Sequence, residues 1–161
     1  MSISAGDTLP EATLSRMGAE GVETVTLSDR LKGRKVVIFG IPGAFSGTCQ
    51  VEHVPSFIRT KDALAEKGVE EIICIAVNDP FVMKAFAEAT GADEAGLTML
   101  CDADSAFSKA IGMELTVPAI GFFSRSKRYA MLVEDGTVTR FLPEQTRGCE
   151  TSAGEALLAA M

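Results

Sequence analysis

KVVIFGI (35–41) and VEEIICIAV (69–77) are two short, nearly unbroken apolar runs separated by a segment rich in helix formers, residues 48–67. Unbroken apolar runs of this length are typical of strands covered on both faces, as in a parallel sheet. The intervening segment ends at Gly68, a residue type that commonly terminates helices. We therefore predict a βαβ unit with a right-handed crossover, in which Pro55 bends the helix.

Further elements are predicted on the carboxyl-terminal side of this unit. Asp79 suits a helix N-cap, and the Asp135-Gly136 pair between two β-rich runs indicates a hairpin. In chain order we expect a helix from 79 to 91, a strand at 97–101, a helix at 104–111, strands at 129–133 and 137–142, and a helix after a capping box at 152–155. The order predicts one α/β domain over residues 1–161, a central mixed sheet flanked by helices. A thioredoxin-like arrangement is one of several α/β folds that fit this order.

Composition excludes several classes of function. With 161 residues and 47% hydrophobic residues, the chain is long and apolar enough for a packed core. Fifteen basic against 22 acidic residues give a net charge of −7, which disfavours nucleic acid as a partner. No apolar run approaches the roughly 18 residues of a membrane span. The start, MSISAGDTLP, has no secretory pattern, so we expect a cytoplasmic protein.

Four cysteines lie far apart in the sequence, at Cys49, Cys74, Cys101 and Cys149. The sequence has no Cys-x-x-Cys pair, and its single histidine gives few ligands for a Cys/His zinc site. We therefore expect no metal and no cofactor. A reducing cytosol also disfavours standing disulfides. For each cysteine the alternatives are therefore catalysis and inert burial.

Cys49 has the surroundings of a reactive thiol. It follows a predicted buried strand and opens a helix, where free N–H groups and the helix dipole favour the thiolate. The Ser46 hydroxyl, three residues earlier, is close enough to bond the sulfur or a substrate oxygen, and Pro42 can shield the sulfur from bulk water. The alternative is a small buried apolar residue. The loop position, the neighbouring Gly43 and Gly47, and the helix start favour the reactive thiol.

The spacing Pro42-x-x-x-Ser46-x-x-Cys49 resembles the peroxiredoxin active-site signature, with Ser46 where most members carry threonine. The preceding context and Cys49-x-x-x-His53 resemble the type II, or peroxiredoxin 5-like, subfamily. The similarity continues through residues 71–83, 124–131 and 135–136, so it covers nearly the whole chain. It implies a thioredoxin-like fold, the reduction of hydrogen peroxide and organic hydroperoxides to water and alcohols, a role in redox homeostasis and a homodimer.

The resemblance also implies the roles of individual residues. The Cys49 thiolate would attack a peroxide oxygen and become a sulfenic acid. The Ser46 hydroxyl, the Cys49 backbone N–H and Arg128 would stabilise the charge that develops on the leaving oxygen. Without the resemblance, Arg128 is better interpreted as a solvated charge in the basic run 125–128.

His53 lies one helical turn beyond Cys49, so the two side chains share a helix face. We favour a structural or pKa-tuning role for His53 over a role as proton acceptor. Glu52 beside it is interpreted as a charge at the helix start with a similarly modest role.

The thiol that resolves the sulfenic acid stays open. Cys74 matches the spacing of plant-like type II members but lies in a buried run, whereas Cys149 lies in a polar segment near the carboxyl terminus. An external thiol, from glutathione with glutaredoxin or from thioredoxin, is the third alternative. Cys101 closes an apolar strand and is interpreted as core.

Two other functions compete with a thiol peroxidase. A disulfide oxidoreductase is disfavoured because no second cysteine lies within helical reach of Cys49. A peroxide-sensing redox relay or holdase without significant turnover uses the same cysteines and stays open. We expect a homodimer through the edge that carries the active-site loop, where Phe45, Phe81 and Val82 supply apolar surface.

Overall fold

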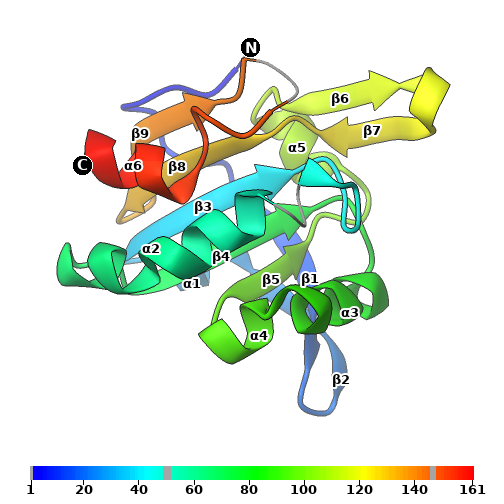
Figure 1. The fold of residues 1–161 in the computed structure, drawn as a ribbon, viewed down its shortest axis with the longest axis horizontal. Coiled ribbons are helices and arrows are strands. Elements are labelled where there is room, and N and C mark those ends of the chain that lie inside the picture. The colour runs from blue at the N-terminus through cyan, green and yellow to red at the C-terminus, as the bar shows by residue number, and fades with distance from the viewer. Residues whose placement is uncertain (1, 49–51, 146–147) are drawn as a thin grey trace.

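The computed structural model describes residues 2–48, 52–145 and 148–161. Figure 1 shows a twisted sheet with helices on both faces. The elements are β1 (Thr13–Gly18), β2 (Gly21–Thr26), α1 (Leu27–Leu31), β3 (Lys35–Ile41), α2 (Val54–Glu66), β4 (Glu71–Ala76), α3 (Pro80–Thr90), α4 (Ala92–Ala95), β5 (Thr98–Cys101), α5 (Ala106–Ala110), β6 (Glu114–Val117), the 3-10 helix η2 (Pro118–Ile120), β7 (Phe122–Ser126), β8 (Tyr129–Glu134), β9 (Thr137–Pro143) and α6 (Gly154–Ala160).

The main sheet has the strand order β2-β1-β5-β4-β3-β8-β9. Strand β3 pairs in parallel with β4, and β4 pairs in parallel with β5. On its other side β3 pairs antiparallel with β8. The prediction of an α/β fold with a central mixed sheet is confirmed. Because β8 runs against β3, the start of β8 lies beside the carboxyl end of β3, which is where the candidate site forms.

Each face of the sheet carries its own apolar core because successive side chains of a strand point to opposite faces. Val37, Phe39 and Ile41 of β3 pack in the cluster that includes residues of α2, α3 and α6. Val36 and Ile38 pack in the second cluster, with residues of α1 and α5. Helices cover the strand on both sides, which explains why residues 36–41 have no polar position.

Residues that start, end or turn the chain correctly predicted the ends of α3 and the β8–β9 turn. Asp79 caps α3 by accepting a hydrogen bond from the Val82 N–H at 2.9 Å, and Gly91 ends it in the left-handed conformation. Asp135 and Gly136 both have positive φ, 49° and 78°, as a tight two-residue hairpin turn requires. The predicted N-cap and hairpin are confirmed.

Pro55 lies in the first turn of α2, and Glu52 and His53 directly before it have π-helical geometry. The bend at Pro55 stays a prediction, because residues 49–51 of the expected helix lie outside the described residues. One local prediction is wrong. The capping box at 152–155 does not form, because the Ser152 hydroxyl donates to Glu144 and Glu155 pairs with Arg59. Ala153 stands at the N-cap of α6 without a side-chain hydrogen bond.

Two hairpins were not predicted. Strands β1 and β2 pair from Thr13↔Thr26 to Gly18↔Gly21 and form one edge of the sheet. Strands β6 and β7 form a separate two-stranded sheet that projects from one end of the molecule in Figure 1. Both hairpins are poor in buried apolar residues, so their sequences lack a strong alternating pattern.

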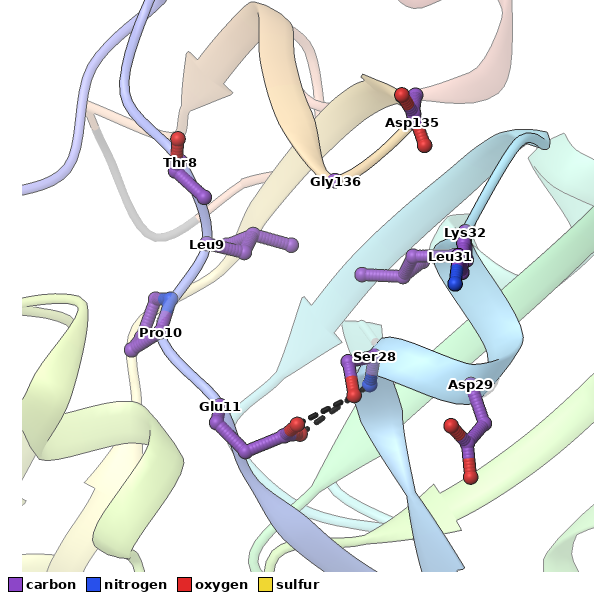
Figure 2. Close-up of a pocket in the computed structure, with 10 residues that line it drawn as sticks. All are labelled: Thr8, Leu9, Pro10, Glu11, Ser28, Asp29, Leu31, Lys32, Asp135 and Gly136. Atoms are coloured by element: carbon purple, nitrogen blue, oxygen red, sulfur yellow. Dashed lines mark hydrogen bonds between the residues drawn. The ribbon is translucent and has the colours of Figure 1, made fainter.

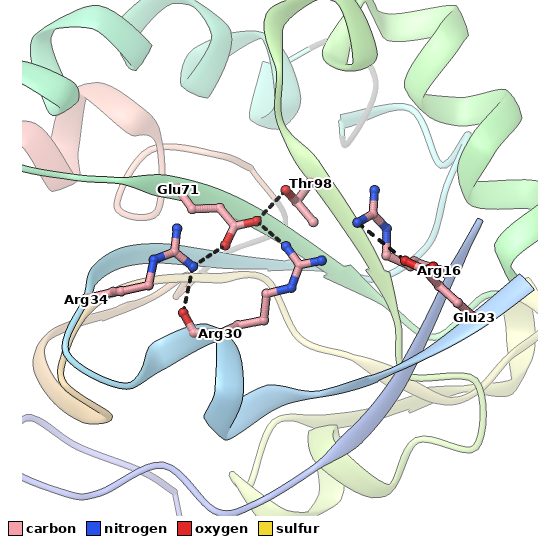
Figure 3. Close-up of polar contacts among 6 residues, drawn as sticks. All are labelled: Arg16, Glu23, Arg30, Arg34, Glu71 and Thr98. Atoms are coloured by element: carbon pink, nitrogen blue, oxygen red, sulfur yellow. Dashed lines mark hydrogen bonds and ion pairs between the residues drawn. The ribbon is translucent and has the colours of Figure 1, made fainter. Parts of the chain in front are cut away.

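A compact ion-pair network joins α1 to the amino end of β4. The Glu71 carboxylate accepts from Arg30 Nη1 at 2.7 Å, from Arg34 Nη1 at 3.0 Å and from the Thr98 hydroxyl at 2.6 Å (Figure 3). The Glu71 side chain is only 10% exposed. By contrast, Arg16 and Glu23 on the β1–β2 hairpin form a looser pair at 3.6 Å, with side chains 33% and 50% exposed.

Among the described helices, none combines the length and the apolar character that a membrane crossing requires.

Candidate active site

The loop after β3 carries the predicted motif. Ile41 ends the strand, Pro42 is half-buried, and the Ser46 hydroxyl donates to the Gly43 carbonyl at 2.7 Å. The Ser46 oxygen therefore offers its lone pairs, rather than its proton, to any further partner. Cys49, the predicted nucleophile, lies outside the described residues.

The same loop is held by α3 and the residue before it. The Ala44 N–H donates to Asn78 Oδ1 at 2.9 Å. The Phe45 ring packs edge-on against Phe86, with 5.3 Å between ring centroids, while 48% of its surface stays exposed. Phe45 also has a φ of 60°, which is uncommon for a bulky residue and indicates a backbone shaped by its surroundings. The loop is thus tied to the core at its centre.

Arg125 of β7 also contacts this loop, a contact that the sequence did not predict. Its Nη1 donates to the Pro42 carbonyl at 3.4 Å, and its guanidinium carbon lies 5.3 Å from the centroid of the Phe122 ring. A Cβ atom on Gly43 would overlap Arg125 Nη1, so any larger residue there would make the guanidinium shift away from its present position. The basic run 125–128 was the available signal, but it did not distinguish Arg125 from its neighbours.

Arg128 immediately precedes β8, opposite the carboxyl end of β3, because Tyr129 pairs with Gly40. The residue is 8% exposed, and its Nη1 lies 3.1 Å from His53 Nδ1. The interpretation of Arg128 as a solvated surface charge is therefore wrong. The fold brings Arg128 and His53, 75 residues apart in sequence, into direct contact.

His53 is fully buried between the sheet and α2, with its ring 4.9 Å from that of Phe39 and 5.6 Å from that of Phe57. Its Nε2 lies 2.9 Å from the Ser152 carbonyl oxygen. A carbonyl can only accept, so Nε2 carries the hydrogen and Nδ1 presents a lone pair to Arg128. Burial, and next the Arg128 charge, lower the pKa of His53 to about 3. His53 is neutral at physiological pH.

Glu52 precedes His53 and is exposed, as expected for a charge near the helix start. Cys149, in contrast, is a half-buried free thiol. Burial raises the pKa of Cys149 to about 11, against the opposing effects of the Arg128 charge and a hydrogen bond with Ser152. Cys149 therefore lies in the electrostatic field of Arg128.

The other two cysteines lie in the sheet. Cys74 is fully buried at the centre of β4, opposite Phe39 on β3 and Met99 on β5. Cys101 ends β5 at 1% exposure, and burial, followed by the charge of Asp79, raises its pKa to about 12. The interpretation of Cys101 as a core residue is confirmed.

Glu144 was not singled out in the sequence, yet it organises the segment before α6. Its carboxylate accepts from the backbone N–H groups of Glu150, Thr151 and Ser152 and from the Ser152 hydroxyl. Burial alone would raise the pKa of Glu144, but these hydrogen bonds outweigh it and the pKa is lowered. Glu144 therefore stays ionised.

A cavity of about 360 Å³ lies at the opposite end of β3, among residues 8–11, 28–29, 31–32 and 135–136 (Figure 2). The Glu11 carboxylate lies in this region and accepts hydrogen bonds from the N–H and the hydroxyl of Ser28. These bonds lower the pKa of Glu11, and the bond from the hydroxyl is the largest cause. Within residues 2–48, 52–145 and 148–161, no three His, Cys, Asp or Glu side chains converge as metal ligands.

Comparison with known proteins agrees with this geometry. The sequence model of the family described as Redoxin matches residues 4–158. Peroxiredoxin-2E-2 of rice, Oryza sativa subsp. japonica, named as chloroplastic, is 41% identical over 164 residues, which cover 99% of this chain and 73% of the rice protein. The chloroplast location is that of the rice protein, and the cytoplasmic location of this chain stays a prediction.

Two solved structures are similar over nearly the whole chain. Reduced Prx3 from Vibrio vulnificus in complex with hydrogen peroxide has 43% identity and a TM-score of 0.91, covering 98% of each chain. Peroxiredoxin 5 from Alvinella pompejana has 31% identity and a TM-score of 0.85, covering 98% of this chain and 97% of that one. The predicted thioredoxin-like fold is confirmed by these neighbours.

Proposed function

We propose that the chain, which belongs to the Redoxin family and within it to the type II peroxiredoxins, reduces hydrogen peroxide and organic hydroperoxides through the thiolate of Cys49. Relatives at this level of identity support a thiol-dependent peroxidase as the class of activity. The substrate range, the residue roles and the electron donor are the parts that we propose. We treat residues 1–161 as one catalytic domain.

The chemistry follows from the charges that the reaction creates. The Cys49 sulfur takes the terminal oxygen of the peroxide and becomes a sulfenic acid, while the second oxygen leaves as alkoxide or hydroxide and is protonated to alcohol or water. Arg128 cannot lose its proton and can donate to the sulfur and to the peroxide oxygens. Because the Ser46 proton is engaged by Gly43, we assign Ser46 the role of accepting the peroxide O–H, with Pro42 shielding the thiolate.

The observation that carries this proposal is the position of Arg128. Arg128 precedes β8, which pairs antiparallel with β3, so it lies at the end of β3 from which the loop with Pro42 and Ser46 begins. Its charge is buried, and a neutral His53 is one partner of its guanidinium. A neutral partner does not cancel the guanidinium charge, so this contact leaves Arg128 able to attract a thiolate and a developing oxyanion.

For the resolving step we propose that Cys149 is favoured over Cys74 if resolution is internal. Cys74 lies at the centre of β4, hydrogen-bonded to neighbours on both sides, so its exposure would unpair two strands. Cys149 is half-buried and lies outside the helices and strands. Glutathione with glutaredoxin, or thioredoxin, then supplies the reducing equivalents, or attacks the Cys49 sulfenic acid directly.

Peptide mapping of peroxide-oxidised protein, trapped without reductant, tests the resolving step. A Cys49–Cys149 disulfide is expected for internal resolution. A Cys49–Cys74 disulfide, or a sulfenic acid or glutathione adduct at Cys49 alone, contradicts the assignment of Cys149.

The donor is tested by peroxide consumption with thioredoxin, glutaredoxin and glutathione supplied in parallel, each with hydrogen peroxide and an organic hydroperoxide. Sustained turnover with at least one donor is expected. Rapid thiol oxidation without turnover for any donor would instead support the redox-relay or holdase function.

We also propose a homodimer through the edge that carries the active-site loop. Phe45 and Phe81 are 48% and 69% exposed there, and Val82 is half-buried beside Phe81. Light scattering at micromolar concentration is expected to give twice the 17.0 kDa chain mass. A strictly monomeric mass would contradict the dimer, and a dimer that survives Phe81→Glu and Phe45→Glu together would place the interface elsewhere.

A further inference from the structure

Glu144 contacts the candidate active site from two directions. Its backbone N–H donates to the Arg128 carbonyl at 2.9 Å, because β9 has just paired with β8. Its carboxylate accepts from Glu150 N–H at 3.0 Å, from Thr151 N–H at 3.4 Å, and from the N–H and hydroxyl of Ser152 at 3.0 and 2.9 Å. One half-buried carboxylate thus gathers four donors from a three-residue segment.

Ser152 connects the Glu144 carboxylate to His53. The serine is completely buried, and both its N–H and its hydroxyl point to Glu144. With these two groups fixed, the Ser152 carbonyl is directed at His53 Nε2, 2.9 Å away. This arrangement also explains why Ser152 does not cap α6, since its hydroxyl is already used.

His53 in turn determines how Arg128 is held. The Ser152 carbonyl keeps the hydrogen on Nε2, so Nδ1 has a lone pair that accepts from Arg128 Nη1 at 3.1 Å. In the other tautomer an N–H would face the N–H of the guanidinium, and the two donors would repel. The tautomer of His53 is therefore a condition for this arginine contact.

We propose that Glu144 is a positioning residue for Arg128: its carboxylate fixes Ser152, whose carbonyl selects the Nε2–H tautomer of His53 and so gives Arg128 a neutral acceptor. The proposal rests on the proposed function only in assigning Arg128 to the peroxide reaction. The relay has a chemical purpose, because a carboxylate bound directly to Arg128 would neutralise the charge that the thiolate and peroxide need. With His53 between them, the Glu144 carboxylate aligns the guanidinium without itself neutralising the charge of Arg128.

The single histidine of the chain makes a direct spectroscopic test possible. In the ¹⁵N-labelled full chain near neutral pH, long-range ¹⁵N–¹H NMR is expected to show one neutral Nε2–H tautomer for His53. Glu144→Gln, which replaces acceptor lone pairs by an amide N–H₂, should yield mixed tautomers. It should also lower the second-order rate constant with peroxide by about tenfold, the scale of a small misplacement of a reacting group.

Glu150→Gln is the matched control, because it removes the same charge from the same segment while only the backbone N–H of Glu150 takes part in the network. It should leave the tautomer and the rate unchanged. If Glu144→Gln does not fold by circular dichroism, Ser152→Ala replaces it, since this change removes a single donor from the carboxylate. A pure Nε2–H tautomer in the variant used would overturn the proposal, as would an equal change in the Glu150→Gln control.

A double-mutant cycle separates this proposal from the proposed function. In an Arg128→Ala background, Glu144→Gln should change the peroxide rate no further, because the residue through which it acts is absent. An additive loss of rate would overturn the relay while leaving the peroxidase intact. If the unmodified chain does not react with peroxide, the proposed function fails, and the NMR tautomer still decides whether Glu144 selects the state of His53.

Discussion

Arg128 Nη1 lies 3.1 Å from His53 Nδ1, and both side chains are buried beside the loop that follows β3. The other ring nitrogen of His53, Nε2, donates to the Ser152 carbonyl. Burial lowers the pKa of His53 to about 3, and the Arg128 charge is the second cause. His53 is therefore a neutral hydrogen-bond acceptor for Arg128. This role agrees with the sequence interpretation of a structural or tuning function, and it excludes a protonated imidazolium near neutral pH.

Arg128→Lys is expected to lower the second-order rate constant with peroxide by about tenfold or more, because a point charge lacks the two-pronged guanidinium geometry. Arg128→Ala should lower it further and raise the pKa of Cys49, since a nearby positive charge is lost. Stopped-flow kinetics and the pH dependence of alkylation measure the two effects. The exposed neighbour gives the control: Lys127→Ala should leave both unchanged. An unaltered rate and Cys49 pKa in Arg128→Ala would remove Arg128 from the mechanism.

His53 makes stability depend on pH in a defined direction. Its pKa is about 3 in the folded chain against 6.5 for an unperturbed histidine, so the unfolded chain binds the proton first as pH falls. The contribution is fully present above about pH 6.5 and is lost as pH falls toward about 3. At about pH 5 the loss amounts to about 2 kcal/mol.

Urea unfolding at about pH 7 and about pH 5 measures this effect when the chain is compared with His53→Gln. The variant should lose less stability between the two pH values, because carboxylates titrate in both proteins and cancel in the comparison. Equal losses in the two proteins would show that His53 titrates normally in the folded state.

Glu71→Ala is expected to reduce the free energy of unfolding by about 2–3 kcal/mol, because it leaves Arg30 and Arg34 partly buried without their shared carboxylate. Glu23→Ala, at the exposed pair with Arg16, should change it by less than about 1 kcal/mol. Urea unfolding checks both variants, and the rate with peroxide should not change in either. A similar loss in both would show that burial of Glu71 does not strengthen its pairs.

Gly40 and Tyr129 face each other across β3 and β8, and the contact leaves no room for a larger residue. A Cβ on Gly40 would lie 2.2 Å from Tyr129 Cε1, so Gly40→Ala should destabilise the fold by about 3 kcal/mol through overpacking. Tyr129→Phe, in contrast, should be neutral or stabilising, because its buried hydroxyl has no hydrogen-bond partner among the described residues. Thermal unfolding measures both, and a large loss for Tyr129→Phe would reveal a partner for the hydroxyl.

The sequence predicted the elements whose patterns are strong and local. The apolar runs of β3 and β4, the Asp79 cap of α3 and the Asp135-Gly136 turn have clear physical signatures in a few residues. The β1–β2 and β6–β7 hairpins were missed because they bury few side chains and so show little periodicity.

The candidate site also contains some residues that the sequence alone predicts and others that it does not. Pro42, Ser46 and Cys49 form a contiguous motif that can be found in the sequence alone. Arg128 was assigned only through resemblance to a family, because its burial depends on the antiparallel pairing of β8 with β3. Glu144 was missed because three of its four donors in residues 150–152 are backbone N–H groups, which no residue type reveals.

The central claim, that Cys49 is the residue that peroxide oxidises, is tested most directly by stopped-flow measurement of hydrogen peroxide reduction by the reduced chain and by Cys49→Ser, followed by intact-mass analysis. The chain should consume about one equivalent of peroxide rapidly in the absence of reductant. Cys49→Ser should show no fast phase and no added oxygen or new disulfide, because a hydroxyl is a far poorer nucleophile at neutral pH. Peroxide reduction by Cys49→Ser at a rate comparable to that of the unmodified chain would contradict the account.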